Sequence, residues 1–144
     1  MVKIKGKKLY MSQVWKKMKV IPVTILNIGK NSDAFKTLKE GERIVISGKS
    51  KGRGFQGVVK RHGFHGMDKS HGTKHHLRAP GSIGSAGLGR VIPGKKMAGR
   101  MGQETITIKN IEIIELRPDK GEVLIKGAAP GMKKSEIEIR VGDK

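Results

Sequence analysis

The feature that most limits how this chain can fold is a glycine-rich basic segment in its middle, residues 50–102. It holds 13 of the 21 glycines, all five histidines, and 11 lysines and arginines against a single acid, Asp68. No apolar repeat with the period of a strand or a helix persists in it. Such a segment cannot bury enough apolar surface to offset the entropy cost of ordering its backbone. We therefore expect residues 50–102 to be disordered when alone, or to form a long irregular extension.

The two flanking zones, residues 1–49 and 103–144, have the patterns of β-strands. Runs of β-branched or alternating apolar residues occupy positions 19–28, 43–47, 105–108, 110–116, 122–126 and 136–141. Turn residues separate them, for example at 29–33, 39–42 and 117–121. Strands that pair across the insertion can close a small barrel with no exposed edge. We expect a mostly β fold in which both ends of the chain build one barrel domain and residues 50–102 project from it.

The charge of the chain indicates its class of partner. Its 31 basic and 12 acidic residues give a net charge of +19, which is costly for a compact isolated domain because like charges repel. Nucleic acid is the leading polyanion, since binding releases condensed counterions. A membrane partner is not expected, because no amphipathic helix with a broad apolar face and no run of spanning length is present. The chain has no cysteine and no secretory h-region, so a cytoplasmic protein without disulfides or thiolate zinc sites is expected.

A glycine motif follows the predicted strand at 43–47. The stretch SKGRGFQG, residues 50–57, places Gly52, Gly54 and Gly57 with the spacing of a dinucleotide-binding turn. That turn needs a helix directly after it and an acid about 20 residues further on. Two glycines within the next nine residues argue against a helix, and no acid lies near position 75. We expect no cofactor. These glycines instead let the backbone pass close to a nucleic-acid backbone, and a flexible linker is the plainer alternative.

The histidines and basic residues of the segment are the predicted nucleic-acid contacts. A metal site or a hydrolytic site would need cysteine or carboxylate partners, and only Asp68 is near, so neither a metal, a catalytic residue nor a small-molecule substrate is expected. Histidines that stack on bases or bond to phosphates suit this setting better. The predicted contacts are Lys51, Arg53, Lys60, Arg61, His62, His65, Lys69, His71, Lys74, His75, His76, Arg78, Arg90, Lys95, Lys96 and Arg100.

The few aromatic residues allow two roles. Phe55 and Phe64 either stack on bases or anchor the root of the extension to the barrel. Trp15 lies in a β zone, where we expect it in the core. Met97 and Met101 are expected to pack where the extension returns.

Three stretches of this chain resemble one family. SGKSKGRGFQGVVKRHGF, HGTKHHLRAPGSIGSAG and PGKKMAGRMGQETITIKNIEII, which together span most of residues 47–114, are similar to the universal large-subunit ribosomal protein L-three family in its bacterial form. The resemblance implies a small translation-protein-type β-barrel and a long extension that runs into large-subunit rRNA. It also implies a role in early assembly, neighbouring large-subunit ribosomal proteins as partners, and a place in the cytoplasmic ribosome, with an organellar ribosome as the alternative.

The resemblance also places the tip of the extension near the peptidyl-transferase centre, at Pro80, Gly81, Ser82, Ile83, Gly84 and Ser85. Ser85 stands where many bacterial members carry a glutamine that is methylated in some, so that modification is not expected. A block usually found between the first strands and the glycine motif is missing, which predicts a reduced or open barrel. The rival functions are a general nucleic-acid-binding protein or RNA chaperone with a basic disordered arm, and an enzyme with a histidine-bearing loop.

Overall fold

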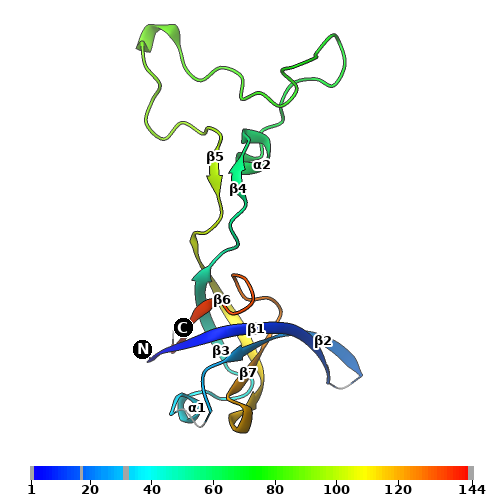
Figure 1. Cartoon of the computed structure of the whole chain (residues 1–144), viewed down its shortest axis with the longest axis vertical. Coiled ribbons are helices and arrows are strands. Elements are labelled where there is room, and N and C mark those ends of the chain that lie inside the picture. The colour runs from blue at the N-terminus through cyan, green and yellow to red at the C-terminus, as the bar shows by residue number, and fades with distance from the viewer. Residues whose placement is uncertain (1, 17, 31–32, 143–144) are drawn as a thin grey trace. The chain divides into compact units, whose positions relative to one another are not determined.

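The computed structural model describes residues 2–16, 18–30 and 33–142, and most of its regular structure is strand (Figure 1). The strands of this described part are β1 (Val2–Lys16), β2 (Lys19–Asn27), β3 (Arg43–Lys49), β4 (Gly54–Gln56), β5 (Gly99–Met101), β6 (Thr105–Arg117), β7 (Glu122–Lys126) and β8 (Glu136–Val141). Its helices are short: α1 (Ala34–Thr37), α2 (Val58–His62), and the 3-10 turns Ala86–Leu88 and Pro118–Lys120. The chain is therefore mostly β, as its sequence patterns indicate.

The chain divides into two units that are described separately. One unit consists of Met1–Lys51 and Gln103–Lys144 and contains six of the strands; we call it the barrel unit. The other is Gly52–Gly102, which we call the arm, and it contains β4, α2 and β5.

The strands of the barrel unit pair in a ring. The order is β1-β2-β7-β6-β3-β8, neighbouring strands of the ring are antiparallel, and β8 returns to β1 through pairs such as Val2 with Val141. In a closed ring each of these strands has a neighbour on both sides. None of them is therefore an edge strand whose unpaired backbone groups could pair with another chain. The sequence predicts a reduced or an open barrel. In the structure, the six strands pair in the order of a small closed ring.

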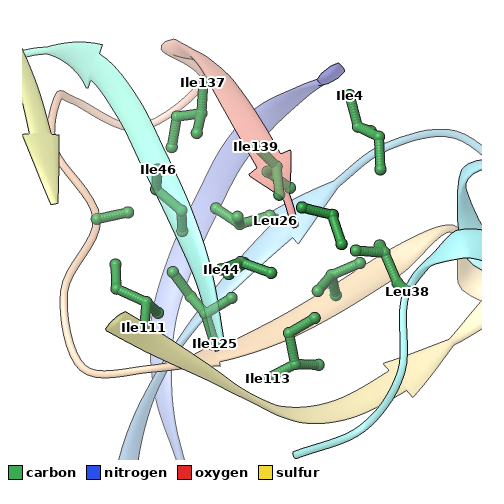
Figure 2. Packing of buried hydrophobic residues seen from close by; sticks show 13 residues of the cluster. Ile4, Leu26, Leu38, Ile44, Ile46, Ile111, Ile113, Ile125, Ile137 and Ile139 are labelled. Carbon is green, nitrogen blue, oxygen red and sulfur yellow. The ribbon is translucent and has the colours of Figure 1, made fainter. Parts of the chain in front are cut away.

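Isoleucine dominates the interior of the ring. Alternation along β3 and β8 points Ile44, Ile46, Ile137 and Ile139 to the same side, where all four are buried (Figure 2). β2, β6 and β7 add to this core, with α1 and the loop after it covering one side. The full set of buried members is Ile4, Leu26, Leu38, Ile44, Ile46, Ile111, Ile113, Val123, Ile125, Ala129, Ile137, Ile139 and Val141.

A second, smaller apolar cluster lies on the opposite face of β2 and β7. Val23, Ile25, Ile114 and Leu124 are buried there, and half-buried residues of the β1–β2 hairpin pack against them. Neighbouring residues of one strand point to opposite faces, so Leu26 packs in the first cluster and Ile25 packs in the second. Burial on both faces explains why this part of β2 reads as a continuous apolar run and not as an alternating one.

A buried lysine ties β1 to the loop between β7 and β8. The register of β1 on β2 shifts between Lys8 and Tyr10, and the Lys8 side chain is almost fully buried. Its Nζ donates to the carbonyl oxygens of Ala129 at 2.7 Å and Gly131 at 3.1 Å. Burial, followed by the nearby charge of Lys51, holds the pKa of Lys8 below its ordinary value.

The predicted strands are largely confirmed, with one merger and one misplaced side chain. The runs at 105–108 and 110–116 form a single strand, β6, because Asn110 takes a positive φ of 59° and lets the strand bend without ending. Part of the turn predicted at 29–33 lies outside the described residues, at 31–32. The expectation for Trp15 was wrong: it is 71% exposed, since the end of the β1–β2 hairpin extends beyond the strands that cover the cores.

Candidate nucleic-acid interface

A short two-stranded ladder forms the root of the arm. β4 and β5 pair through Gly54 with Met101, Phe55 with Arg100, and Gln56 with Gly99, and the Arg53 amide donates to the Met101 carbonyl at 2.9 Å. The ladder brings together two stretches that are separated by more than 40 residues of sequence. It therefore fixes where the outgoing and returning limbs of the arm meet.

The helix α2 directly after the glycine motif overturns one expectation. Val58–His62 form a single helical turn, which ends at Gly63 in the left-handed conformation with φ 73°. The Gly63 amide donates to the Val59 carbonyl at 3.0 Å. The glycine that was taken to prevent a helix instead caps the end of a short one, a common use of glycine. One turn is far shorter than the helix of a dinucleotide-binding unit, and no acid follows it at the required distance.

Two of the predicted RNA contacts hold the limbs of the arm together. Arg61 Nη1 donates to the Met97 carbonyl at 2.8 Å, and His62 Nε2 lies 2.9 Å from the same oxygen. Both side chains are half-buried, and the His62 ring lies 6.1 Å from the ring of Phe64. Arg61 and His62 therefore hold the outgoing limb of the arm against the returning limb at Met97, in addition to any contact with RNA.

The other predicted contacts are exposed side chains on the surface. They are Lys51, Arg53, Lys60, His65, Lys69, His71, Lys74, His75, His76, Arg78, Arg90, Lys95, Lys96 and Arg100. All five ion pairs found between described residues lie in the barrel unit. Within the described chain no lysine of the arm lies within ion-pair distance of a carboxylate, so the charge of these lysines is not neutralised by the fold.

The arm has almost no interior. Of residues 52–102, all of which are described, only Val58 is buried. Phe55 is 75% exposed, so it does not anchor the root by burial, whereas Phe64 is half-buried beside His62. At the predicted tip, Pro80 to Ser85 are all exposed, and the Ser82 hydroxyl donates to the Gly84 carbonyl at 2.9 Å. An arm of this kind gains little from its own packing, and what stabilises it must come from outside.

Within residues 2–16, 18–30 and 33–142, no three histidines or carboxylates gather as ligands for one metal ion. In the same ranges, no helix is long and apolar enough to cross a lipid bilayer.

Comparison with known proteins assigns the family. A family model described as Ribosomal protein L3 matches residues 12–123. The chain belongs to the ribosomal protein L3 family. Among relatives, the Large ribosomal subunit protein uL3 of Desulfotalea psychrophila is 46% identical over 125 residues, which are 86% of this chain and 59% of that protein. The protein of the same name from Chlorobium limicola is 48% identical over 110 residues, which are 76% of this chain and 53% of that protein. The chain thus spans somewhat more than half the length of these L3 relatives.

The part of the chain that matches the L3 family includes the whole arm. In the barrel unit, the sequence analysis missed one residue, Lys8, and misplaced another, Trp15. Lys8 was not singled out, although its place after Ile4 and Gly6 in an alternating run puts it at an inward position. Trp15 was assigned to the core, and no local pattern shows that the hairpin carrying it extends past its neighbours.

Proposed function

We propose that this chain is a structural constituent of the large ribosomal subunit that binds large-subunit rRNA. It supports early assembly and organises rRNA near the peptidyl-transferase centre, alongside neighbouring large-subunit proteins in the cytoplasm. The proposal rests on membership of the L3 family together with one observation: an arm of 51 residues with a single buried side chain carries a dense set of exposed cations. No catalytic role is assigned to any residue.

The mechanism follows from the character of the arm. Ordering its backbone costs about 1–2 kcal/mol per residue, and its own packing returns little of this. RNA phosphates on several sides supply charge-assisted contacts to the exposed lysines and arginines. Glycines keep the backbone thin enough to pass between RNA helices. The barrel unit acts as a rigid base that reads RNA shape and phosphate and fixes where the arm enters.

Two arginine variants test the proposal. Arg53 lies at the root of the arm and Arg43 on β3 of the barrel unit, and both side chains are exposed. We expect Arg53→Ala to reduce co-sedimentation of the full chain with large subunits after a high-salt wash more than Arg43→Ala does. The reason is that phosphates surround the arm on more sides than they surround the barrel. Equal losses would show that the arm is no more engaged than the barrel.

A competition experiment separates this function from the alternative of a general nucleic-acid-binding protein or RNA chaperone. Labelled large-subunit rRNA is bound by the chain and challenged with unlabelled rRNA or with random RNA duplex of equal mass. We expect the rRNA to compete far better. Equal competition would favour the general binder and remove the ribosomal assignment.

A further inference from the structure

A single backbone oxygen links the two limbs of the arm just beyond the β4–β5 ladder. Arg61, in the last turn of α2, reaches the returning limb, where its Nη1 donates to the Met97 carbonyl at 2.8 Å. His62 Nε2 lies 2.9 Å from the same oxygen. A carbonyl oxygen has two lone pairs, so it can accept from the guanidinium and from a protonated Nε2 at once. The two side chains that meet this oxygen are 36 and 35 residues away from it in the sequence.

Gly99, on β5, leaves the space in which the Arg61 guanidinium lies. A Cβ at position 99 would be 2.6 Å from the Arg61 Nη1 and 3.2 Å from its Cζ, and the first distance is shorter than real Cβ contacts. The backbone of Gly99 is not in the left-handed region, so its conformation does not require glycine. Any side chain at position 99 would therefore push the tip of Arg61 off the Met97 carbonyl, while the backbone could stay as it is.

Beyond these contacts the limbs separate, as Figure 1 shows between α2 and β5. In residues 65–96, all of which are described, the backbone hydrogen bonds join residues no more than ten positions apart. The longest of them runs from the Met67 amide to the Leu77 carbonyl. The bond from Arg61 to Met97 is therefore the outermost hydrogen-bonded link between the outgoing and returning limbs of the described arm.

We propose that Arg61 is a positioning residue, which forms with His62, Met97 and Gly99 a clasp that closes the arm into a loop before RNA binds. The proposal rests on the rRNA binding proposed above. It divides the arm into a root that is ordered in the free chain and a loop, residues 63–96, that RNA orders. Bringing the two ends of so long a loop together costs entropy. Because the clasp has already closed the loop in the free protein, RNA binding does not have to supply that cost. Arg61 then raises the affinity by shaping the arm, in contrast to the phosphate contact that the sequence predicts for it.

Gly99→Ala tests the clasp because it displaces the guanidinium without changing any charge. The full chain is followed by amide hydrogen exchange in the free state and by filter binding to a large-subunit rRNA fragment. We expect Gly99→Ala and Arg61→Ala each to speed exchange of the β4 and β5 amides and to weaken rRNA binding about tenfold. In the Arg61→Ala background, Gly99→Ala should have no further effect, because no guanidinium is left to displace. The slope of log affinity against log salt should stay at the parent value in Arg61→Ala, since no phosphate contact is lost.

Two controls accompany these variants. Gly87→Ala also adds a Cβ to a glycine of the arm outside the left-handed region, where it would meet only the Ser85 Oγ at 4.0 Å. It should leave exchange of the β4 and β5 amides unchanged. The Ile113 amide, which donates to the Glu42 carbonyl at 3.0 Å in the barrel unit, should keep its protection in every variant and so shows that the barrel is still folded.

The outcomes separate the clasp from the function on which it rests. If Arg61→Ala flattens the salt slope by about 1 while Gly99→Ala binds rRNA as the parent does, Arg61 contacts a phosphate and the proposal is wrong. Additive effects of the two substitutions, or unchanged exchange of the β4 and β5 amides in both variants, overturn it as well. If the parent chain does not bind rRNA, the proposed function fails, and the exchange measurements still decide whether the clasp closes the free arm.

Discussion

Lys8 brings a positive charge into the barrel unit, and its ammonium group holds the loop between β7 and β8. Two carbonyl oxygens, of Ala129 and Gly131, receive its hydrogen bonds, and both of those residues are buried. Removing a lysine from water is unfavourable, as the lowered pKa of Lys8 records. Removing the lysine altogether is worse, because the carbonyl groups then lose their donor in a place that water reaches poorly.

We expect Lys8→Met to lower the free energy of unfolding by about 1–3 kcal/mol. Lys7→Met is the matched control: it removes the same charge from the neighbouring, exposed position and should change stability by less than about 0.5 kcal/mol. Urea denaturation of the full chain measures both. Equal effects would mean that the two carbonyl contacts contribute nothing.

The same pair of proteins predicts a pH effect. Because the pKa of Lys8 is lowered by folding, the unfolded chain binds this proton more tightly than the folded chain does. The stability contributed by position 8 therefore rises as the pH climbs from that lowered pKa toward the ordinary lysine value. The difference in unfolding free energy between the parent and Lys8→Met should widen in favour of the parent over this range.

At the level of elements, the root of the arm joins β4, α2 and β5 around two glycines with different tasks. Gly54 has φ +67°, a conformation that costs an L-residue roughly 1–2 kcal/mol, so the fold itself needs glycine there. Gly57, the N-cap of α2, has an ordinary φ of −69°, and a Cβ built on it would meet nothing within 4 Å. The isolated chain has no need of glycine at position 57. If a side chain there is harmful, the reason must lie in a close external partner.

Gly57→Thr tests that reasoning, since threonine is a favourable N-cap residue and adds bulk without charge. We expect the unfolding free energy to change by less than about 0.5 kcal/mol, while incorporation into large subunits, followed on sucrose gradients, falls clearly. Gly54→Thr should instead speed hydrogen exchange of the Arg53 amide in the free protein, because the β4–β5 ladder weakens. Normal incorporation of Gly57→Thr would remove close backbone approach as the reason for that glycine.

The elements of the barrel unit could be predicted because their signals are local. Runs such as Glu122–Lys126 and Glu136–Val141 alternate or cluster β-branched residues, and both form strands with those bounds. The helix α2 could not be predicted, because a glycine that ends a helix looks the same in sequence as one that prevents it. The exposure of Trp15 and the burial of Lys8 depend on where β1 passes its neighbours, which is set by the closure of the ring. For the site, the exposed cations were identifiable from sequence, while the internal use of Arg61 and His62 required the return limb to be in place.

For the molecule as a whole, nearly all acidic residues belong to the barrel unit, so the positive charge of the arm is almost unopposed within the arm. Residues 50–102 carry 11 of the 31 basic residues with one acid, while the other 11 acids belong to the barrel unit, where Glu115 pairs with Arg117 and Glu138 with Arg140. RNA affinity should therefore be dominated by phosphate contacts of the arm. If about eight phosphates are neutralised, the slope of log affinity against log salt should be about −7 on duplex-like RNA, taking the coefficient of B-DNA.

Filter binding to an rRNA fragment at a series of salt concentrations measures that slope. Replacing Lys95 and Lys96 together by glutamine should make the slope less steep by about 2 if both lysines meet phosphates. Replacing Lys133 and Lys134, an adjacent exposed pair of the barrel unit, is the matched control and should change it less. A flat salt dependence of the parent protein would contradict an electrostatic arm.

The pairing of β1 with β8 also governs the order of events during synthesis. At about 5–20 residues per second, β1 leaves the exit tunnel on the order of 10 s before β8 has been made. The whole arm is translated in that interval. It can therefore bind RNA while β1, β2 and β3, which are made before it, still lack β8 as a pairing partner. A nascent chain with this connectivity can bind RNA through the arm before the barrel unit is complete. RNA binding can therefore precede the pairing of β1 with β8 that closes the ring.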